Sequence, residues 1–270
     1  MSKYGLYSSY VSIKEYSNLE QENLKDWSSI MSRSKYFYIR IKGEYALFVD
    51  PLTKGGGEKV SYPIPTKQAL LGIVDACYFK PTISNHIEEV RVINPIQTQV
   101  RGNRALIKKY SSDLNYYSYL ADVEYLVKFY FTWNLSRQDL INDRNMKKHE
   151  AIMERSIRKG GRRDIFLGTR ECVAYLDWIS EDEFLSKKSY YQDNKISFGI
   201  MFNQFKYPTQ EDEKLRAYYS EVILDNGLVK YKDLEDCTIY NEVSHYSFKT
   251  IKDIKPVKEE YLEYLSWEEK

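Results

Sequence analysis

The feature that most constrains the fold of this chain is a strict alternation of residue types from Val123 to Trp133. Every second residue of that run is apolar or aromatic, and most of the residues between them are polar or charged. A period of two residues is typical of a β-strand, because successive side chains of a strand point to opposite faces of its sheet. Since so many large side chains share one face, this strand is expected to lie at the centre of a sheet.

A shorter alternation follows Tyr36, in which Phe37, Ile39 and Ile41 point to one face. It predicts a second half-buried strand, followed by a turn at residues 43–44. A polar stretch in which basic residues and tyrosines interleave is expected later, over residues 98–119. The other strands of this part of the chain are expected at residues 45–49, 90–96 and 165–176.

The first helix is expected to begin after Thr66. The hydroxyl of Thr66 is a favourable N-cap, and the helix should close at Lys80-Pro81, because the residue before a proline avoids the helical region. Tyr78 falls one residue past the apolar stripe, so we expect its side chain to project from the edge of the fold. The stripe itself consists of Leu70, Ile73, Val74 and Cys77.

A second helix is expected to follow the central strand. Asn142-Asp143 is its expected N-terminal cap, and Gly160-Gly161 is expected to stop it, because adjacent glycines adopt the backbone conformation that ends a helix. The apolar stripe of this helix consists of Met146, His149, Met153 and Ile157.

The resulting order is strand, helix, strand, strand, helix, strand. This is the split β-α-β topology of the ferredoxin-like (RRM-like) fold, which is common among RNA-binding modules. Later strands are indicated by alternation over residues 196–202 and by the hairpin signal Asp225-Asn226-Gly227. We therefore predict an α+β protein with an N-terminal extension (1–34, with Met31 as an alternative start), a ferredoxin-like domain (35–179) and a smaller β-rich C-terminal lobe with an acidic, partly helical tail (180–270).

The chain also has a local excess of positive charge. Eight Arg and Lys residues and only two Glu lie between Arg144 and Arg163, although the formal charge of the whole chain is +1. Such an excess favours a polyanionic partner, for which RNA or DNA phosphate is the natural candidate. The same pattern is also typical of a solvated helix face. The 26 tyrosines could stack on bases or fill a core, so their number does not distinguish an RNA-binding protein from any other folded protein.

Several classes of protein are disfavoured by the sequence. It has no apolar run long enough to span a membrane and no secretory signal, so we expect a cytoplasmic protein without a membrane partner. The three cysteines form no CxxC pair, which argues against disulfides and a thiolate zinc site. P-loop, GxSxG and clustered-carboxylate patterns are also missing. We expect no metal and no cofactor.

Of the three histidines, His149 is the candidate for chemistry, because Lys148 precedes it and further basic residues share its helix. His86 is expected in a loop and His245 in the β-rich lobe, and neither has companions that suggest a role. From spacing alone, His149 is better interpreted as a histidine at the edge of the core. If the partner is RNA, however, its 2′-hydroxyl can attack the adjacent phosphate, and the protein then needs only proton transfer and stabilisation of negative charge.

Two long ungapped runs resemble a known family. They are EYALFVDPLTKGGGEKVSYPIPTKQALLGIVDACYFKP (44–81) and DRNMKKHEAIMERSIRKGGRRDIFLGTREC (143–172). Both closely resemble the type I-C (Dvulg) CRISPR-associated Cas-five family of the d-type. The resemblance is strong over about residues 36–176 and looser beyond them. It implies a ferredoxin-like (RAMP) domain with a β-rich C-terminal extension.

The resemblance also implies an activity and its partners. Members of the family cut the CRISPR repeat transcript without a metal ion and keep the 5′ handle of the product. They then join a surveillance complex beside its large and backbone subunits, through which they meet target DNA indirectly. By resemblance, the catalytic set of this chain is Tyr78, Lys148 and His149.

We assign provisional roles to these residues. His149 is expected to transfer a proton to the leaving 5′-oxygen, Lys148 to stabilise phosphoryl charge, and Tyr78 to position or deprotonate the 2′-hydroxyl. The products would be a 2′,3′-cyclic phosphate and a 5′-hydroxyl. RNA phosphates are expected to contact a set that we call the basic cluster: Arg155, Arg158, Lys159, Arg162, Arg163 and Arg170.

Two alternatives to the endoribonuclease remain open. The protein could be a non-catalytic scaffold that holds the handle of the CRISPR RNA inside such a complex. It could also be a protein-interaction module with an incidental basic helix, which would bind no RNA tightly.

Overall fold

The computed structural model describes residues 33–51, 53, 58–106, 112–208 and 214–245, and five positions near the C-terminus (258, 261, 262, 264 and 265). The expected N-terminal extension up to residue 32, with Met31, lies outside the described residues, and so do the loop glycines 55–57. The strands of the described chain are β1 (Phe37–Ala46), β2 (Lys59–Val60), β3 (Ile83–Val92), β4 (Gln97–Leu106), β5 (Ser112–Trp133), β6 (Ile165–Phe166), β7 (Val173–Trp178), β8 (Lys195–Lys206), β9 (Lys214–Asp225), β10 (Leu228–Lys230) and β11 (Ile239–His245). The helices are α2 (Lys67–Cys77), α3 (Met146–Arg158), α4 (Glu181–Ser186) and the 3₁₀ turns η3 (Gln138–Asp143) and η4 (Leu234–Asp236).

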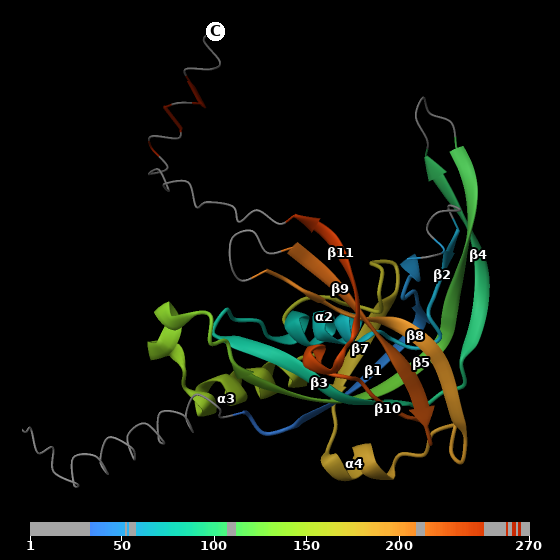
Figure 1. Ribbon diagram of the computed structural model, residues 1–270, viewed down its shortest axis with the longest axis horizontal. Coiled ribbons are helices and arrows are strands. Elements are labelled where there is room, and N and C mark those ends of the chain that lie inside the picture. Colours follow the sequence, from blue (N-terminus) through green and yellow to red (C-terminus); the bar gives the residue numbers. More distant parts are fainter. Residues whose placement is uncertain are drawn as a thin grey trace, which may run out of the picture.

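A large, mostly antiparallel sheet organises the fold (Figure 1). Strand β5 lies between β1 and β3, and β7 pairs with the other edge of β1, so that the central order is β3-β5-β1-β7. All of these pairings are antiparallel. The central position expected for the alternating strand is therefore confirmed.

The face predicted to be apolar forms the core. Phe37, Ile39 and Ile41 of β1 are completely buried, and they share one cluster with the inward side chains of β5, α2 and α3. The opposite face is covered as well, because Tyr38 of β1 packs against Phe184 of α4. Both faces of the central strands are thus shielded, which explains why even the alternate positions of these strands are partly buried.

Helix α2 begins as predicted but ends earlier. The Thr66 hydroxyl accepts a hydrogen bond from the Ala69 amide at 3.2 Å, and the predicted stripe is buried. The helix stops at Cys77, because Tyr78 is extended with φ −158° and ψ 116°. The expectation that Tyr78 projects from the edge of the fold is wrong, since only 1% of the residue is exposed. Its extended backbone turns the ring inward, toward α3.

Helix α3 starts two to three residues later than expected. Its N-cap is Asn145, whose side chain accepts a hydrogen bond from the Lys148 amide at 3.1 Å. Asn142 and Asp143 lie in the preceding turn η3 instead. The predicted stop is confirmed, because Gly160 and Gly161 have φ values of +80° and +104°.

Strand boundaries differ from the sequence expectations in four places. Strand β1 continues through the turn expected at residues 43–44, and the expected polar stretch 98–119 forms the hairpin of β4 and the first half of β5. The strand expected over 165–176 is divided into β6 and β7. The strand expected over residues 90–96 is β3, which begins earlier, at Ile83, and ends at Val92, so that His86, expected in a loop, lies in it.

The C-terminal strands join the same sheet. The predicted hairpin turn between β9 and β10 is confirmed by positive φ values at Asn226 and Gly227, and β10 pairs with β3. The alternation of β8 is interrupted by register shifts on both sides of Met201, which turn Met201 and Asn203 inward. The division at residue 180 stays a prediction. The five described tail positions are helical, and no helix of the described chain is long and apolar enough to cross a membrane.

Candidate active site

Tyr78 and His149 meet in the core between two helices. Tyr78 follows the last residue of α2, and His149 lies in the first turn of α3. The phenol oxygen is 2.8 Å from Nδ1 of His149, and the two rings lie with their centroids 6.0 Å apart. A second contact joins α2 and α3 close to this pair, because the Ser156 hydroxyl donates a hydrogen bond to the Cys77 carbonyl oxygen.

The surroundings of His149 define which ring nitrogen carries a proton. Its Nε2 lies 2.9 Å from the backbone carbonyl oxygen of Asp143, which can only accept a hydrogen bond. Nε2 therefore carries hydrogen, and in the neutral ring Nδ1 is left to accept the hydroxyl proton of Tyr78. Edge-on contacts with Trp133 and Phe131 hold the imidazole in this orientation.

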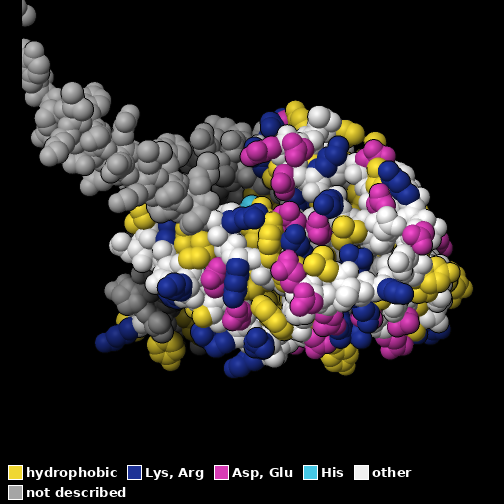
Figure 2. Space-filling model, turned by 90° about the horizontal axis from the view of Figure 1, so that it is seen from below, with side chains coloured by type: hydrophobic (Ala, Val, Ile, Leu, Met, Phe, Trp, Pro, Cys, Tyr) yellow, Lys and Arg dark blue, Asp and Glu magenta, His cyan; other side chains and the backbone are white. Residues whose placement is uncertain are grey.

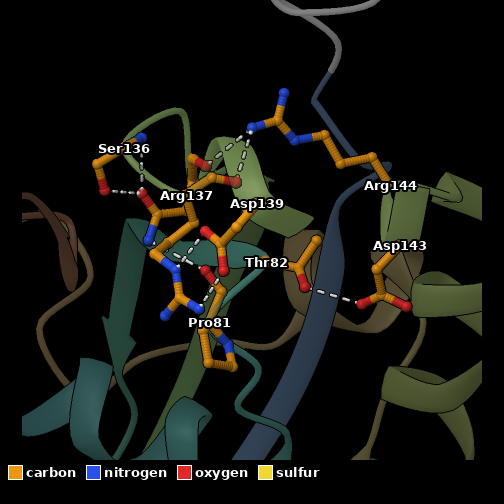
Figure 3. A network of polar contacts seen from close by, with 8 residues as sticks. Pro81, Thr82, Ser136, Arg137, Asp139, Asp143 and Arg144 are labelled. Carbon is orange, nitrogen blue, oxygen red and sulfur yellow. Dashed lines mark hydrogen bonds and ion pairs between the residues drawn. The ribbon is translucent and has the colours of Figure 1, made fainter. Parts of the chain in front are cut away.

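Asp143 is the functional candidate that the sequence argument missed. Its carboxylate accepts a hydrogen bond from Thr82 Oγ1 at 2.8 Å (Figure 3). It also pairs with Lys148 Nζ and lies 3.4 Å from Nε2 of His149. The hydrogen bonds from Lys148 and Thr82 hold the pKa of this carboxyl below its ordinary value. Asp143 in turn raises the pKa of the Lys148 ammonium.

The phenol of Tyr78 experiences opposing influences. Burial raises its pKa, while the Arg162 guanidinium and the Lys148 ammonium act to lower it. The Arg162 guanidinium lies 4.8 Å from the centroid of the Tyr78 ring. A free phenolate is therefore disfavoured, although two cations are close enough to stabilise one.

The three predicted catalytic residues differ strongly in exposure. His149 is completely buried, whereas the Lys148 side chain is 49% exposed. A ligand in solvent thus meets Lys148 and the exposed Arg162 before it meets Tyr78 or His149. Arg144, the first residue of the basic stretch, donates hydrogen bonds to the carbonyl oxygens of Asn134 and Arg137 (Figure 3).

The basic cluster lies at the end of α3 and in the segment that follows. All six of its members are exposed. Arg158 lies over Trp178 at 5.1 Å, and Arg162 joins the cluster to the Tyr78 ring. On the face of the molecule shown in Figure 2, Lys and Arg side chains are interspersed with Asp and Glu, so the positive charge of that face is largely balanced. Among the described residues, no three His, Cys, Asp or Glu side chains are grouped to hold a metal ion.

The chain is similar to two solved structures. One is a crystal structure of a functionally uncharacterized protein from Streptococcus mutans, with 52% identity and a TM-score of 0.68. The other is a crystal structure of a CRISPR-associated protein, with 49% identity and a TM-score of 0.69. Each likeness covers 78% of this chain and 98% of the other chain.

A curated relative and a family pattern agree with these likenesses. The relative is the CRISPR pre-crRNA endoribonuclease Cas5d of Thermus thermophilus, which is 30% identical over 148 residues. That match covers 51% of this chain and 61% of the length of the relative. The sequence pattern of the CRISPR-associated Cas5d proteins matches residues 37–229. This range is most of the chain and confirms the resemblance noted in its sequence, so the chain belongs to the Cas5d family of CRISPR-associated proteins.

Proposed function

We propose that this protein is an endoribonuclease that cuts CRISPR repeat RNA and keeps the 5′ handle as a subunit of a type I-C surveillance complex. The observation that carries the proposal is the contact of Tyr78 with His149, beside Lys148 and next to the basic cluster. Membership of the family and the name of the Thermus thermophilus relative support it. The expected partners are the RNA and the large and backbone subunits, with target DNA met indirectly, in the cytoplasm.

The arrangement of strands supports a ferredoxin-like domain. In that fold a strand lies between two parallel strands joined by a helix. Here β5 lies between β1 and β3, α2 connects those two strands, and α2 and α3 pack in the same core cluster. We propose that residues 35–179 form this domain and that residues 180–270 form its β-rich extension.

The contacts of His149 revise the role expected for it. Both ring nitrogens have partners inside the fold, so His149 exchanges protons through Tyr78 and not directly with the leaving 5′-oxygen. In the proposed step, Tyr78 accepts the proton of the 2′-hydroxyl as its own proton moves to Nδ1 of His149. This relay avoids a free phenolate, which burial disfavours.

The remaining steps use the exposed cations. The 2′-oxygen forms a bond to phosphorus while the bond to the 5′-oxygen breaks, and the 5′-oxygen takes a proton from solvent. His149 then returns its extra proton through Tyr78 to solvent, which restores the starting state. Lys148 and Arg162 would stabilise the charge that develops on the phosphoryl oxygens. The Arg162 guanidinium lies over the Tyr78 ring, and the Lys148 ammonium acts to lower the pKa of the phenol. A phosphate that binds these cations would draw them outward. Because the nucleophile belongs to the RNA, this route requires no metal ion.

The test uses the purified protein, a labelled repeat hairpin and a chelator. We expect the wild type to cut the hairpin in the presence of chelator, to leave a 2′,3′-cyclic phosphate, and to bind but not cut a hairpin with deoxyribose at the mapped position. Cleavage of that deoxy hairpin would refute the mechanism, because no 2′-hydroxyl is available to attack.

One observation favours a second candidate function. His149 is completely buried and Tyr78 nearly so, which is also what a structural hydrogen bond in a non-catalytic, handle-binding scaffold would look like. The scaffold predicts tight binding of the repeat hairpin without cutting. The endoribonuclease predicts cutting that disappears in His149→Ala while binding persists.

A further inference from the structure

A cavity of about 570 Å³ lies on the other side of the segment that carries Tyr78. It is lined by residues of α2, β3, β8 and the region of η4. Because Tyr78 is extended, its side chain and that of Phe79 point to opposite sides of the backbone. Tyr78 thus faces the active-site candidates, and Phe79 faces the cavity. The volume falls within the range of pockets for small ligands.

Aromatic side chains give the cavity stacking surfaces. Phe79 is 56% exposed and Tyr207 is 55% exposed, and both line it. On its β3 side, the ring of His86 stacks on Tyr130 with an interplanar angle of 15°. Unpaired RNA bases bind to aromatic faces of this kind, because every base has a π-face.

The charges of the cavity disfavour a phosphate. Its one lysine, Lys67, is buried and already binds the Asp233 carboxylate and the Lys232 carbonyl oxygen. The acidic side chains outnumber it and would repel a phosphate group. They suit a ligand edge that donates hydrogen bonds. The acidic residues of the lining are Asp75, Asp233 and Glu235.

Asp75 is placed to accept hydrogen bonds from such a ligand. One carboxylate oxygen accepts a hydrogen bond from Asn85 Nδ2 at 2.8 Å. The other oxygen accepts none from the described part of the chain. Burial raises the pKa of this carboxyl, and N–H donors from a ligand would oppose that effect.

The cavity is connected to the active-site candidates by hydrogen bonds. Asn134, which lines it, donates through Nδ2 to the Pro81 carbonyl oxygen at 3.0 Å and through its amide to Thr82 at 2.9 Å. Thr82 in turn donates to Asp143 (Figure 3), and the Asp143 carboxylate pairs with Lys148. A group bound in the cavity would therefore lie beside the residues that we propose to act on the scissile phosphate.

We propose that this cavity binds one unpaired nucleobase of the RNA next to the cleaved linkage, with Phe79 and Tyr207 as stacking faces and Asp75 as the hydrogen-bond acceptor. The proposal rests on the function proposed above. Guanine fits best, because its Watson–Crick edge presents adjacent N–H donors to one carboxylate, whereas uracil presents one donor between two acceptors.

The experiment compares guanine with inosine, which differs only by lacking the 2-amino group. Repeat hairpins with deoxyribose at the mapped cut carry G, inosine, C, A or U at each of three positions on either side of it. For the wild type, we expect one position at which inosine weakens binding about tenfold relative to guanine. Asp75→Asn should abolish that difference, and Phe79→Ala should weaken binding of every base at that position.

Controls separate the possible outcomes. Asp177→Asn makes the same charge change on the exposed part of β7 and should leave the preference unchanged, and thermal unfolding checks that each variant folds. A guanine preference that persists in both cavity variants would overturn the inference while leaving the endoribonuclease intact. The inference is also wrong if the variants keep the preference but fail to assemble with the backbone subunit, since the cavity then binds a protein. Absence of RNA binding by the wild type would overturn both proposals.

Discussion

The phenol oxygen of Tyr78 lies 2.8 Å from Nδ1 of His149, although 71 positions separate the two residues in the chain. The contact exists because α2 ends one residue before Tyr78 and the extended backbone there directs the ring toward α3. It joins Nδ1 of His149, the ring nitrogen that is left to accept a proton, to the Tyr78 hydroxyl, which can deliver one. The chemistry proposed for the protein depends on this pair.

Tyr78→Phe removes the hydroxyl and retains the ring. We expect single-turnover cleavage to fall by about 10²- to 10⁴-fold, the usual contribution of proton transfer, with RNA binding unchanged. Because Nδ1 of His149 loses its partner, unfolding free energy should fall by about 1–3 kcal/mol. Tyr175→Phe is the matched control, since Tyr175 is 74% exposed on β7. Full cleavage by Tyr78→Phe would exclude the proposed proton transfer through Tyr78 to His149.

Asp143→Asn tests the carboxylate beside Lys148. The backbone carbonyl that holds Nε2 of His149 remains, so we expect a smaller loss of cleavage than for Tyr78→Phe. The loss should come from a less ordered Lys148, whose ammonium no longer has its anionic partner. Single-turnover rates of the two variants, measured side by side, check this order of effects.

The difference in stability between the wild type and Asp143→Asn should depend on pH. Because the pKa of Asp143 is lowered in the folded protein, its ionised form stabilises the fold above the unfolded pKa, which is about 3.9. That contribution is lost as pH falls through the folded pKa. Wild type should therefore be more stable than Asp143→Asn at neutral pH, and the difference should shrink below about pH 4. Thermal unfolding of both proteins from pH 7 to pH 3 measures this difference in stability. A difference that stays constant over that range would contradict the lowered pKa of Asp143.

Neutralising members of the basic cluster should change how RNA binding depends on salt. Arg158→Gln and Arg163→Gln each remove an exposed cation, and each should lower the slope of log affinity against log salt by about 0.7–0.9. Lys214→Gln is the control, because Lys214 lies on β9 and pairs with Glu242. Unchanged slopes across the whole cluster would exclude it from the RNA interface.

Two glycines should respond to alanine in opposite ways. Gly168 has a φ of +93°, and an added Cβ would overlap the carbonyl group of Leu47, so Gly168→Ala should destabilise the protein by several kcal/mol. Gly72 lies in α2 with open space around its Cβ position, so Gly72→Ala should stabilise it by up to about 1 kcal/mol. Denaturant unfolding of both variants compares them directly.

Periodic patterns were sufficient to locate the principal elements. The central strand, the stripes of α2 and α3, the Thr66 cap and the Asn226-Gly227 turn were all predicted correctly. Each depends on side chains close together in the sequence, whose spacing or backbone preference is the same in any fold. The basic cluster was also found to be exposed at the end of α3, because a run of like charges cannot be buried.

Contacts between distant segments had to be seen in the folded chain. From the sequence, Tyr78 was expected at the edge of the fold and Asp143 was expected only to cap a helix. The direction of the Tyr78 ring depends on where α2 ends and on what α3 presents to it. The cap at Asn145 was missed because Asn142 and Asp143, close by, are equally favourable cap residues. The β4–β5 hairpin was missed because its residues were interpreted only as a polar stretch. Amino-acid order thus determined which segments become helix or strand and which residues carry reactive groups. Only tertiary packing decided which of those groups touch, because a contact across 71 residues is selected by the burial of the whole core.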